Sequence, residues 1–169
     1  MEKIKDENVF KKIVQCSEYI EENGLTYITI DHKKAAYEAV SHLISIGKKD
    51  IYLFSMKKDY TYSTLRREGL IEAMKDNGLE FKRENEILLD ELSIKEAQKH
   101  MNIILNNREV KNIGIFAVSD VIAIGVIKAL NSKNIKIPQE AAIVGFDNID
   151  FSAVIEPSLT TVSQPGYEL

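Results

Sequence analysis

Apolar residues in this chain fall into two kinds of segment that alternate along its length. Short, nearly continuous apolar runs, such as 113–118 and 141–146, are typical of parallel strands that are buried on both faces. Longer segments with apolar residues at helical spacing separate these runs. The pattern predicts strands at 51–55, 86–89, 113–118 and 141–146, and helices at 33–46, 65–77, 121–133 and from Ser93 onward.

The regular alternation of helix and strand predicts the fold class. Strands separated by helices indicate an α/β fold with a doubly wound parallel sheet. Two short strands, at 12–15 and 27–30, precede the regular series. After Asp147 the period is lost, although 159–162 could form one more strand outside the series.

Composition and charge narrow the class of protein. The chain has 169 residues, is 44% hydrophobic and has a net charge of -4, which argues against nucleic-acid binding by this chain alone, because such binding depends on basic patches. Cys16 is the only cysteine, which predicts a small buried side chain, no internal disulfide and a reducing compartment. The sequence has no apolar run long enough for a membrane span and no signal-peptide core, so we expect a cytoplasmic protein without a membrane partner.

Polar side chains follow the predicted strands, where ligands of parallel sheets bind. Ser55, Asp90, Asp120 and Asp147 lie at or near the carboxyl ends of four strands, and these ends meet at one edge of the sheet. A carboxylate can accept hydrogen bonds from two neighbouring hydroxyl groups. We therefore predict a site for a hydroxyl-bearing ligand, with Asp120 and Asp147 as its main contacts.

Arg66 is the third candidate contact. It lies with Arg67 at the predicted start of a helix, where two cations oppose the helix dipole. Arg66 could extend over the strand ends and pair with a ligand, or with Asp120 or Asp147. Simpler alternatives stay open for all three: Asp120 as a helix N-cap, Asp147 as a turn residue and Arg66 as a solvated side chain.

Other kinds of chemistry find no support in the sequence. There is no glycine-rich turn between a strand and a helix, so we predict no nucleotide cofactor. His32, His42 and His100 have no metal-ligand spacing, so we predict no metal. An enzyme on this fold would need a nucleophile or base at the strand ends, and only carboxylates are found there, so we predict that the protein is not an enzyme.

Three stretches resemble the effector-binding half of the lac repressor family of transcription regulators. They are VSDVIAIGVIKAL, IKIPQEAAIVGFDNID and EPSLTTVSQP, and the shorter QCSEY and GFDNID are most similar to the cytidine-repressor branch. The resemblance implies a type I periplasmic-binding-protein fold, with a small effector bound between two subdomains. It implies effector contacts at Asp120, Asp147 and Arg66, and it places Asp31 at the first crossover between the subdomains.

The same resemblance implies a division of the chain and a set of partners. We expect 1–31 and 149–169 to be parts of an N-terminal subdomain, and 32–148 to be a nearly complete C-terminal subdomain. The family's helix-turn-helix has no counterpart here, so we expect a fragment whose parent, a homodimer, binds operator DNA only through that segment and senses a sugar or a nucleoside. Met56 stands where the family usually has glycine, and His32 where it has asparagine. The alternative is the solute-binding protein of a sugar transporter, whose parent would carry a secretory signal.

Overall fold

The structure is a computed structural model that describes residues 13–16, 19, 24–57 and 60–165. It contains two separate sheets, and every strand in each is parallel to its neighbours. The small sheet pairs β1 (Val14–Cys16) with β2 (Thr26–Ile28). The large sheet has the order β4-β3-β5-β6-β7 and consists of β3 (Asp50–Met56), β4 (Glu86–Leu89), β5 (Ile113–Ala117), β6 (Ala141–Asp147) and β7 (Thr160–Ser163).

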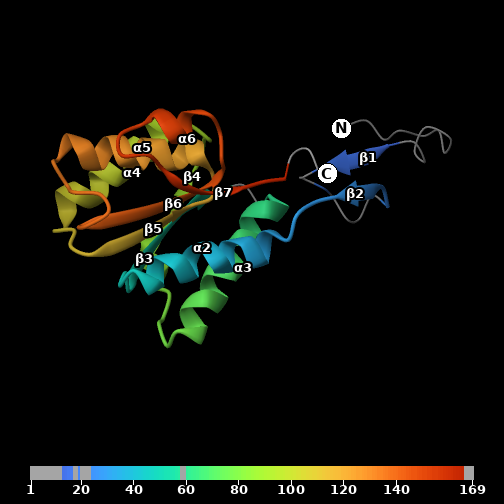
Figure 1. Ribbon diagram of the computed structural model, residues 1–169, viewed down its shortest axis with the longest axis horizontal. Helices are drawn as coiled ribbons and strands as arrows, with labels where there is room; N and C mark the ends of the chain where they lie inside the picture. The colour runs from blue at the N-terminus through green and yellow to red at the C-terminus, as the bar shows by residue number, and fades with distance from the viewer. Residues whose placement is uncertain (1–12, 17–18, 20–23, 58–59, 166–169) are drawn as a thin grey trace.

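Helices cover both faces of the large sheet, which confirms the predicted α/β doubly wound class. Figure 1 shows the sheet between one helix pair, α2 and α3, and a second pair, α4 and α5. The small sheet lies to one side of this unit. The helices are α2 (His32–Ser45), α3 (Thr61–Asp76), α4 (Ile94–Asn107), α5 (Asp120–Ser132), the short α6 (Phe151–Val154) and the 3-10 turn η2 (Arg83–Asn85).

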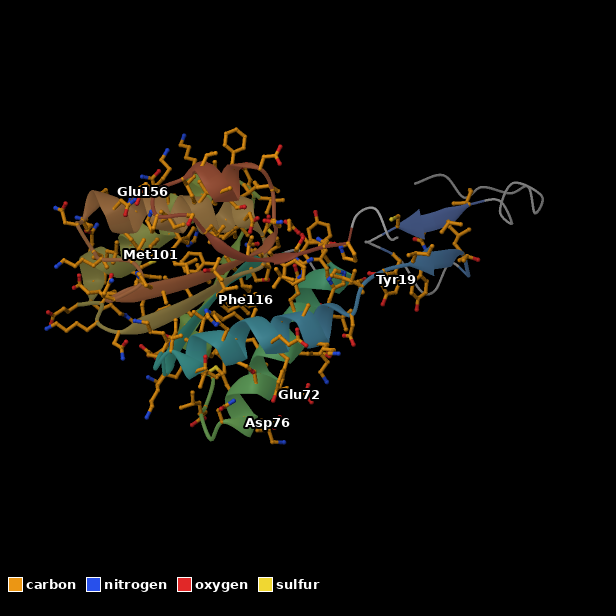
Figure 2. All side chains as sticks on the ribbon, viewed as in Figure 1. Tyr19, Glu72, Asp76, Met101, Phe116 and Glu156 are labelled. Carbon is orange, nitrogen blue, oxygen red and sulfur yellow. The ribbon has the colours of Figure 1, made fainter. Side chains whose placement is uncertain are left out.

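Glycines allow the helices of each pair to approach closely. A Cβ added to Gly69 of α3 would clash with the carbonyl oxygen of Lys33 in α2, and one added to Gly125 of α5 would clash with the carbonyl oxygen of Ile94 in α4. Apolar side chains from the strands fill the space between the sheet and the two helix pairs. Phe116 of the central strand β5 is one of them and is completely buried (Figure 2). Burial on both faces explains why these strands are continuous apolar runs in the sequence.

Three sequence-based predictions differ from the structure. Strand β7 pairs with β6 and therefore belongs to the large sheet, whereas residues from 149 onward were expected in the other subdomain. Helix α3 begins at Thr61, whereas the sequence predicted a start near residue 65. The prediction missed the first turn because that turn is polar and shows no apolar period. Cys16 is exposed in the small sheet, so the expectation of a buried thiol is wrong.

The strand order creates a topological switch point at the carboxyl end of the large sheet. The chain moves outward from β3 to β4 and then returns past β3 to β5, so β3 and β5 are neighbours whose following helices cover opposite faces. Ligands of open α/β sheets bind at such a switch point.

None of the helices in the described parts of the chain has both the length and the apolar character that a membrane span requires.

Candidate functional site

Arg66 is a buried cation at the carboxyl end of the sheet. It lies in the second turn of α3 with only 3% of its side chain exposed, so the alternative of a solvated arginine is wrong. Its Nη1 donates to the carbonyl oxygen of Val118, just beyond β5. The guanidinium carbon lies 3.4 Å from the ring centroid of Phe146 and 4.8 Å from that of Tyr62, which are favourable cation–π geometries. The side chain is therefore held against the ends of β5 and β6.

Asp147 ends β6 and lies beside this guanidinium. Its Oδ1 is 3.9 Å from Arg66 Nη1, and 29% of its side chain is exposed. Oδ1 also accepts a hydrogen bond of 2.7 Å from Gln164 Nε2, and Oδ2 accepts one of 2.9 Å from Ser119 Oγ. The backbone at Asp147 has φ of 113°, which is rare for any residue except glycine. Such strained residues cluster at functional sites, and this one has an accessible carboxylate.

Asp120 occupies a different environment from Asp147. It is the first residue of α5 and is completely buried. Its Oδ1 accepts a hydrogen bond of 2.6 Å from Thr161 Oγ1, and its Oδ2 accepts one of 3.0 Å from the backbone N–H of Ile149. Burial raises the pKa of Asp120 above the ordinary carboxyl value, and these hydrogen bonds oppose that shift in pKa. Asp120 therefore ties the start of α5 to the segment that follows β6, through Ile149, and to strand β7, through Thr161.

The neighbours of Asp120 explain how a carboxylate fits at this position. The N-cap of α5 is Ser119, whose Oγ accepts from the N–H of Val121, so the simple cap alternative for Asp120 is wrong. A Cβ at Gly145 of β6 would clash with Asp120 Oδ1. The glycine in the GFDN stretch thus leaves the space that the buried carboxylate occupies.

The three predicted residues gather at one edge of the sheet, together with two that the sequence analysis missed. Arg66 and Asp147 approach each other directly, and Asp120 follows Ser119, which is bonded to Asp147. Ser119 and Gln164 are the missed residues, because the sequence analysis assigned ligand contacts to charged side chains alone. The position of Gln164, directly after β7, could be foreseen only by placing β7 next to β6.

The remaining strand-end residues are separate from this cluster. Asp90 is exposed after the edge strand β4 and pairs with Lys57 at 3.1 Å, as expected of a surface residue. Ser55 lines a cavity of about 260 Å³ at the ends of β3 and β4, together with Ser63 and Arg67. A further cavity, of about 280 Å³, has a mainly apolar lining that includes Leu43 and Ile127. Neither of these cavities is lined by Arg66, Asp120 or Asp147.

A metal has little basis at this edge. Among the described residues, no three His, Cys, Asp or Glu side chains are grouped closely enough to hold an ion. The polar groups of the cluster are instead one guanidinium, two carboxylates, a hydroxyl and an amide. Such a set can donate and accept several hydrogen bonds at once, as recognition of a hydroxyl-rich molecule requires.

Comparisons with a family model and with known proteins point to the same protein family. Residues 22–169 match the family described as periplasmic binding protein-like domain. The HTH-type transcriptional regulator MalR of Clostridium butyricum is 37% identical over 139 residues, which is 82% of this chain and 41% of that protein. The HTH-type transcriptional repressor CytR of Escherichia coli is 28% identical over 166 residues, which is 98% of this chain and 48% of that protein.

A solved structure agrees with these relatives. The LacI family transcriptional regulator from Enterococcus faecium, with bound ribose, superposes with a TM-score of 0.79 at 27% identity, over 92% of this chain and 56% of that one. This chain spans about half the length of the curated relatives it matches. CytR is among the relatives, as the resemblance implied, but the higher identity to MalR means that the cytidine-repressor branch is not singled out.

Proposed function

Because this chain belongs to the family of periplasmic-binding-protein-like domains found in LacI-family transcriptional regulators, we propose that it is the effector-sensing part of such a regulator. The relatives are named as transcriptional regulators, which favours this function over the solute-binding protein of a transporter. The effector class that fits the cluster best is a sugar or a nucleoside, whose adjacent hydroxyl groups complement carboxylates.

One observation supports the location of the effector site more than any other. Asp147 has a strained backbone and a partly exposed carboxylate, which lies beside the buried guanidinium of Arg66. Among the described contacts, its other hydrogen-bond partners are the neutral side chains of Ser119 and Gln164. Hydroxyl groups of an effector can take the places of Ser119 and Gln164 on this carboxylate. We assign direct contacts to Asp147 and Arg66.

Asp120 has a different role in this proposal. Its side chain has no exposed surface, and both oxygens already accept hydrogen bonds within the protein. The sequence led us to expect a direct contact, whereas burial favours a role beneath the site. Asp120 holds Ile149, just beyond β6, and Thr161, within β7. Asp147 ends β6 and Gln164 follows β7, so Asp120 supports both positions from beneath.

The position of Gln164 gives a route from effector to conformational change. Gln164 directly follows β7, where the chain leaves the large sheet, and it is bonded to Asp147. An effector hydroxyl that replaces the Gln164 amide on Asp147 removes the hydrogen bond that fixes the chain where it leaves the large sheet. The effector can then shift the balance between two arrangements of the regulator to the extent that it binds one more tightly than the other.

Isothermal titration calorimetry tests the site directly. The 169-residue chain and the whole regulator are titrated with ribose, a panel of other sugars and a panel of nucleosides. For any compound that binds, Asp147→Ala should weaken binding by at least about 100-fold, because a charge-assisted bond and the orientation of Arg66 are lost together. Asp90→Ala, which removes another strand-end carboxylate, is the matched control and should leave affinity unchanged.

The result that would overturn the site is equally specific. If a compound binds the wild-type protein and Asp147→Ala leaves its affinity unchanged while the variant melts as a folded protein, the effector does not contact this edge. Asp147→Asn serves as the second variant if the alanine substitution prevents folding, since it preserves the shape of the side chain.

We further propose that the whole regulator acts in the cytoplasm as a homodimer that binds operator DNA through a helix-turn-helix. The names of the relatives as HTH-type regulators support this proposal. The net charge of -4 also favours a DNA-binding surface outside this chain. Gel-shift assays should detect specific operator binding by the whole regulator and none by the 169-residue chain, and specific binding by the chain alone would contradict it.

A further inference from the structure

His32 connects the proposed effector site to the segment that enters the large unit from the small sheet. It is the first residue of α2 and only 1% of its surface is exposed. Its Nδ1 lies 3.4 Å from Arg66 Nε and 3.3 Å from Arg66 Nη2. On the other side of the ring, Nε2 lies 3.1 Å from Oγ1 of Thr29, in the segment between β2 and α2. The imidazole therefore bridges the guanidinium and this segment.

The partners of the ring determine its protonation state. A guanidinium can only donate hydrogen bonds, so Nδ1 of His32 must be the acceptor. A neutral imidazole has one donor and one acceptor nitrogen, so the proton lies on Nε2 and is donated to Thr29 Oγ1. The contact with Arg66 thus requires the neutral ring in one particular tautomer.

We propose that neutral His32 is a positioning residue for the effector site: it holds Arg66 in the orientation that faces Asp147, and it releases Arg66 when it becomes protonated. This role rests on the proposed function, because it specifies how that site is regulated. His32 is not expected to touch the effector itself. It acts through Arg66, and through Thr29 it makes the orientation of Arg66 sensitive to the position of the entering segment.

The groups packed around His32 support an acid-sensitive contact. From α3 it faces Arg66 and the ring of Tyr62, and from β6 it faces Phe146, with ring centroids 6.4 Å and 6.0 Å away. Among the described residues, Asp147 lies beside Arg66, and Asp31 accepts the N–H of Lys34 as the cap of α2. A proton on Nδ1 would remove the acceptor and place a second cation beside a buried guanidinium.

Nuclear magnetic resonance of the ¹⁵N-labelled 169-residue chain tests the contact without any effector. The ring of His32 should show a protonated Nε2 and an unprotonated Nδ1 at neutral pH. The Nε–H signal of Arg66 should exchange slowly with solvent and should move in parallel with the titration of His32 as the pH is lowered. Asparagine can place an uncharged acceptor near the position of Nδ1, so His32→Asn should keep the slowly exchanging Arg66 signal and abolish its dependence on acid.

Two further variants make the test decisive. His32→Leu removes the acceptor and should make the Arg66 Nε–H exchange at least about tenfold faster, whereas His42→Asn at an exposed position of α2 is the control and should change nothing. A proton found on Nδ1 at neutral pH would overturn the proposal. So would an Arg66 signal that is unchanged in His32→Leu, or one that keeps its acid dependence in His32→Asn.

Calorimetry then separates this proposal from the proposed function. The probe is ribose or, where another compound of the panel binds more tightly, that compound. His32→Leu should weaken its binding about 10- to 100-fold at neutral pH, and His32→Asn should remain near wild type but lose the weakening on acidification. Unchanged affinity in His32→Leu would overturn the positioning role even with Asp147 confirmed as a contact. If no compound binds, the proposed function fails, whereas the resonance experiment still decides whether His32 holds Arg66.

Discussion

At the amino end of the large sheet, the buried ammonium group of Lys48 donates to Asn112 Oδ1 at 2.9 Å and to the carbonyl oxygen of Gln139 at 2.8 Å. These three residues lie just before β3, β5 and β6. At the carboxyl end, the buried charges are Arg66 and Asp120, and a partly exposed, strained Asp147 accompanies them. Both ends bury charge, but the buried ammonium at the amino end meets neutral oxygens, whereas the buried guanidinium at the carboxyl end lies beside a partly exposed carboxylate.

The difference separates the contributions of the two ends to stability and to binding. Lys48 bonds to two neutral acceptors and so links the starts of three strands. This interaction stabilises the sheet and leaves no charged group of its own for a ligand. The carboxyl end includes one enclosed carboxylate that supports the structure and one accessible carboxylate that can bind. Parallel sheets carry ligand sites at this end because the following helices begin there, and the substitutions below test whether the two ends are as distinct as the contacts indicate.

The largest expected loss of stability comes from Asp120→Ala. The substitution leaves the partly buried hydroxyl of Thr161 and N–H of Ile149 without their acceptor and opens a space where the buried carboxylate was, so the free energy of unfolding should fall by about 2–4 kcal/mol. Urea denaturation measures the change. Asp90→Ala, which removes an exposed ion pair, should cost less than about 1 kcal/mol. Equal losses in the two variants would mean that Asp120 does not support the carboxyl end.

A smaller loss is expected from Gly145→Ala. The new Cβ would clash with Asp120 Oδ1 and lie within 2.9 Å of Leu159 Cδ2, and such overpacking typically costs about 1–3 kcal/mol. A double-mutant cycle checks the cause. Combined with Asp120→Ala, the substitution should cost clearly less than it does alone, because the clashing oxygen is gone. Strict additivity would contradict the view that Gly145 makes room for this carboxylate.

The order of the elements could be predicted from the sequence, for a physical reason that the buried strands make clear. Strands enclosed on both faces have to be continuously apolar, so β3, β5 and β6 stand out from the amphipathic helices between them. Strand β7 lies at the edge and is only half-buried, so its sequence, TTVS, carries no comparable signal. Its place beside β6 depends on pairing between segments, which local pattern does not encode.

The candidate site was predictable in its location more than in its roles. Strand-end carboxylates identify the edge, but the sequence does not distinguish an enclosed Asp120 from an accessible Asp147, since the difference arises from Thr161 and Ile149 folding over one of them. The burial of Arg66 was hidden by the misplaced start of α3. The contact of His32 with Arg66 joins residues 34 positions apart and has no local signature.

At the amino end, Lys48→Met should lower the free energy of unfolding by about 1–2 kcal/mol. Methionine fills a similar volume, but the Asn112 side chain and the Gln139 carbonyl lose their shared donor. Lys49→Met, at the exposed neighbouring position, is the matched control and should have almost no effect. Effector affinity should be unchanged in both variants. A large loss of affinity in Lys48→Met would show that the two ends are not independent.

The smallest effects are expected in the pH dependence of stability, where the two ends should behave in opposite ways. Burial raises the pKa of Asp120 above its ordinary value of 3.8. Just above pH 3.8 the folded protein therefore binds more protons at this site than the unfolded chain, so the contribution of Asp120 to stability is full below that pH and is lost as pH rises through the folded pKa. Asp120→Asn should remove this downward slope from the free energy of unfolding.

Burial lowers the pKa of Lys48 below its ordinary value of 10.5, and the sign of the linkage reverses. Just below pH 10.5 the unfolded chain binds more protons at this site, so the free energy of unfolding should gain an upward slope as pH rises in that window. Lys48→Met should remove it, and Lys49→Met should not. Urea denaturation of the four proteins (wild type, Asp120→Asn, Lys48→Met and Lys49→Met) across both windows measures the slopes. If Asp120→Asn altered the alkaline slope, or Lys48→Met the acid one, the charges at the two ends would be coupled through the sheet. The amino end could then not be treated as purely stabilising and the carboxyl end as the separate binding end.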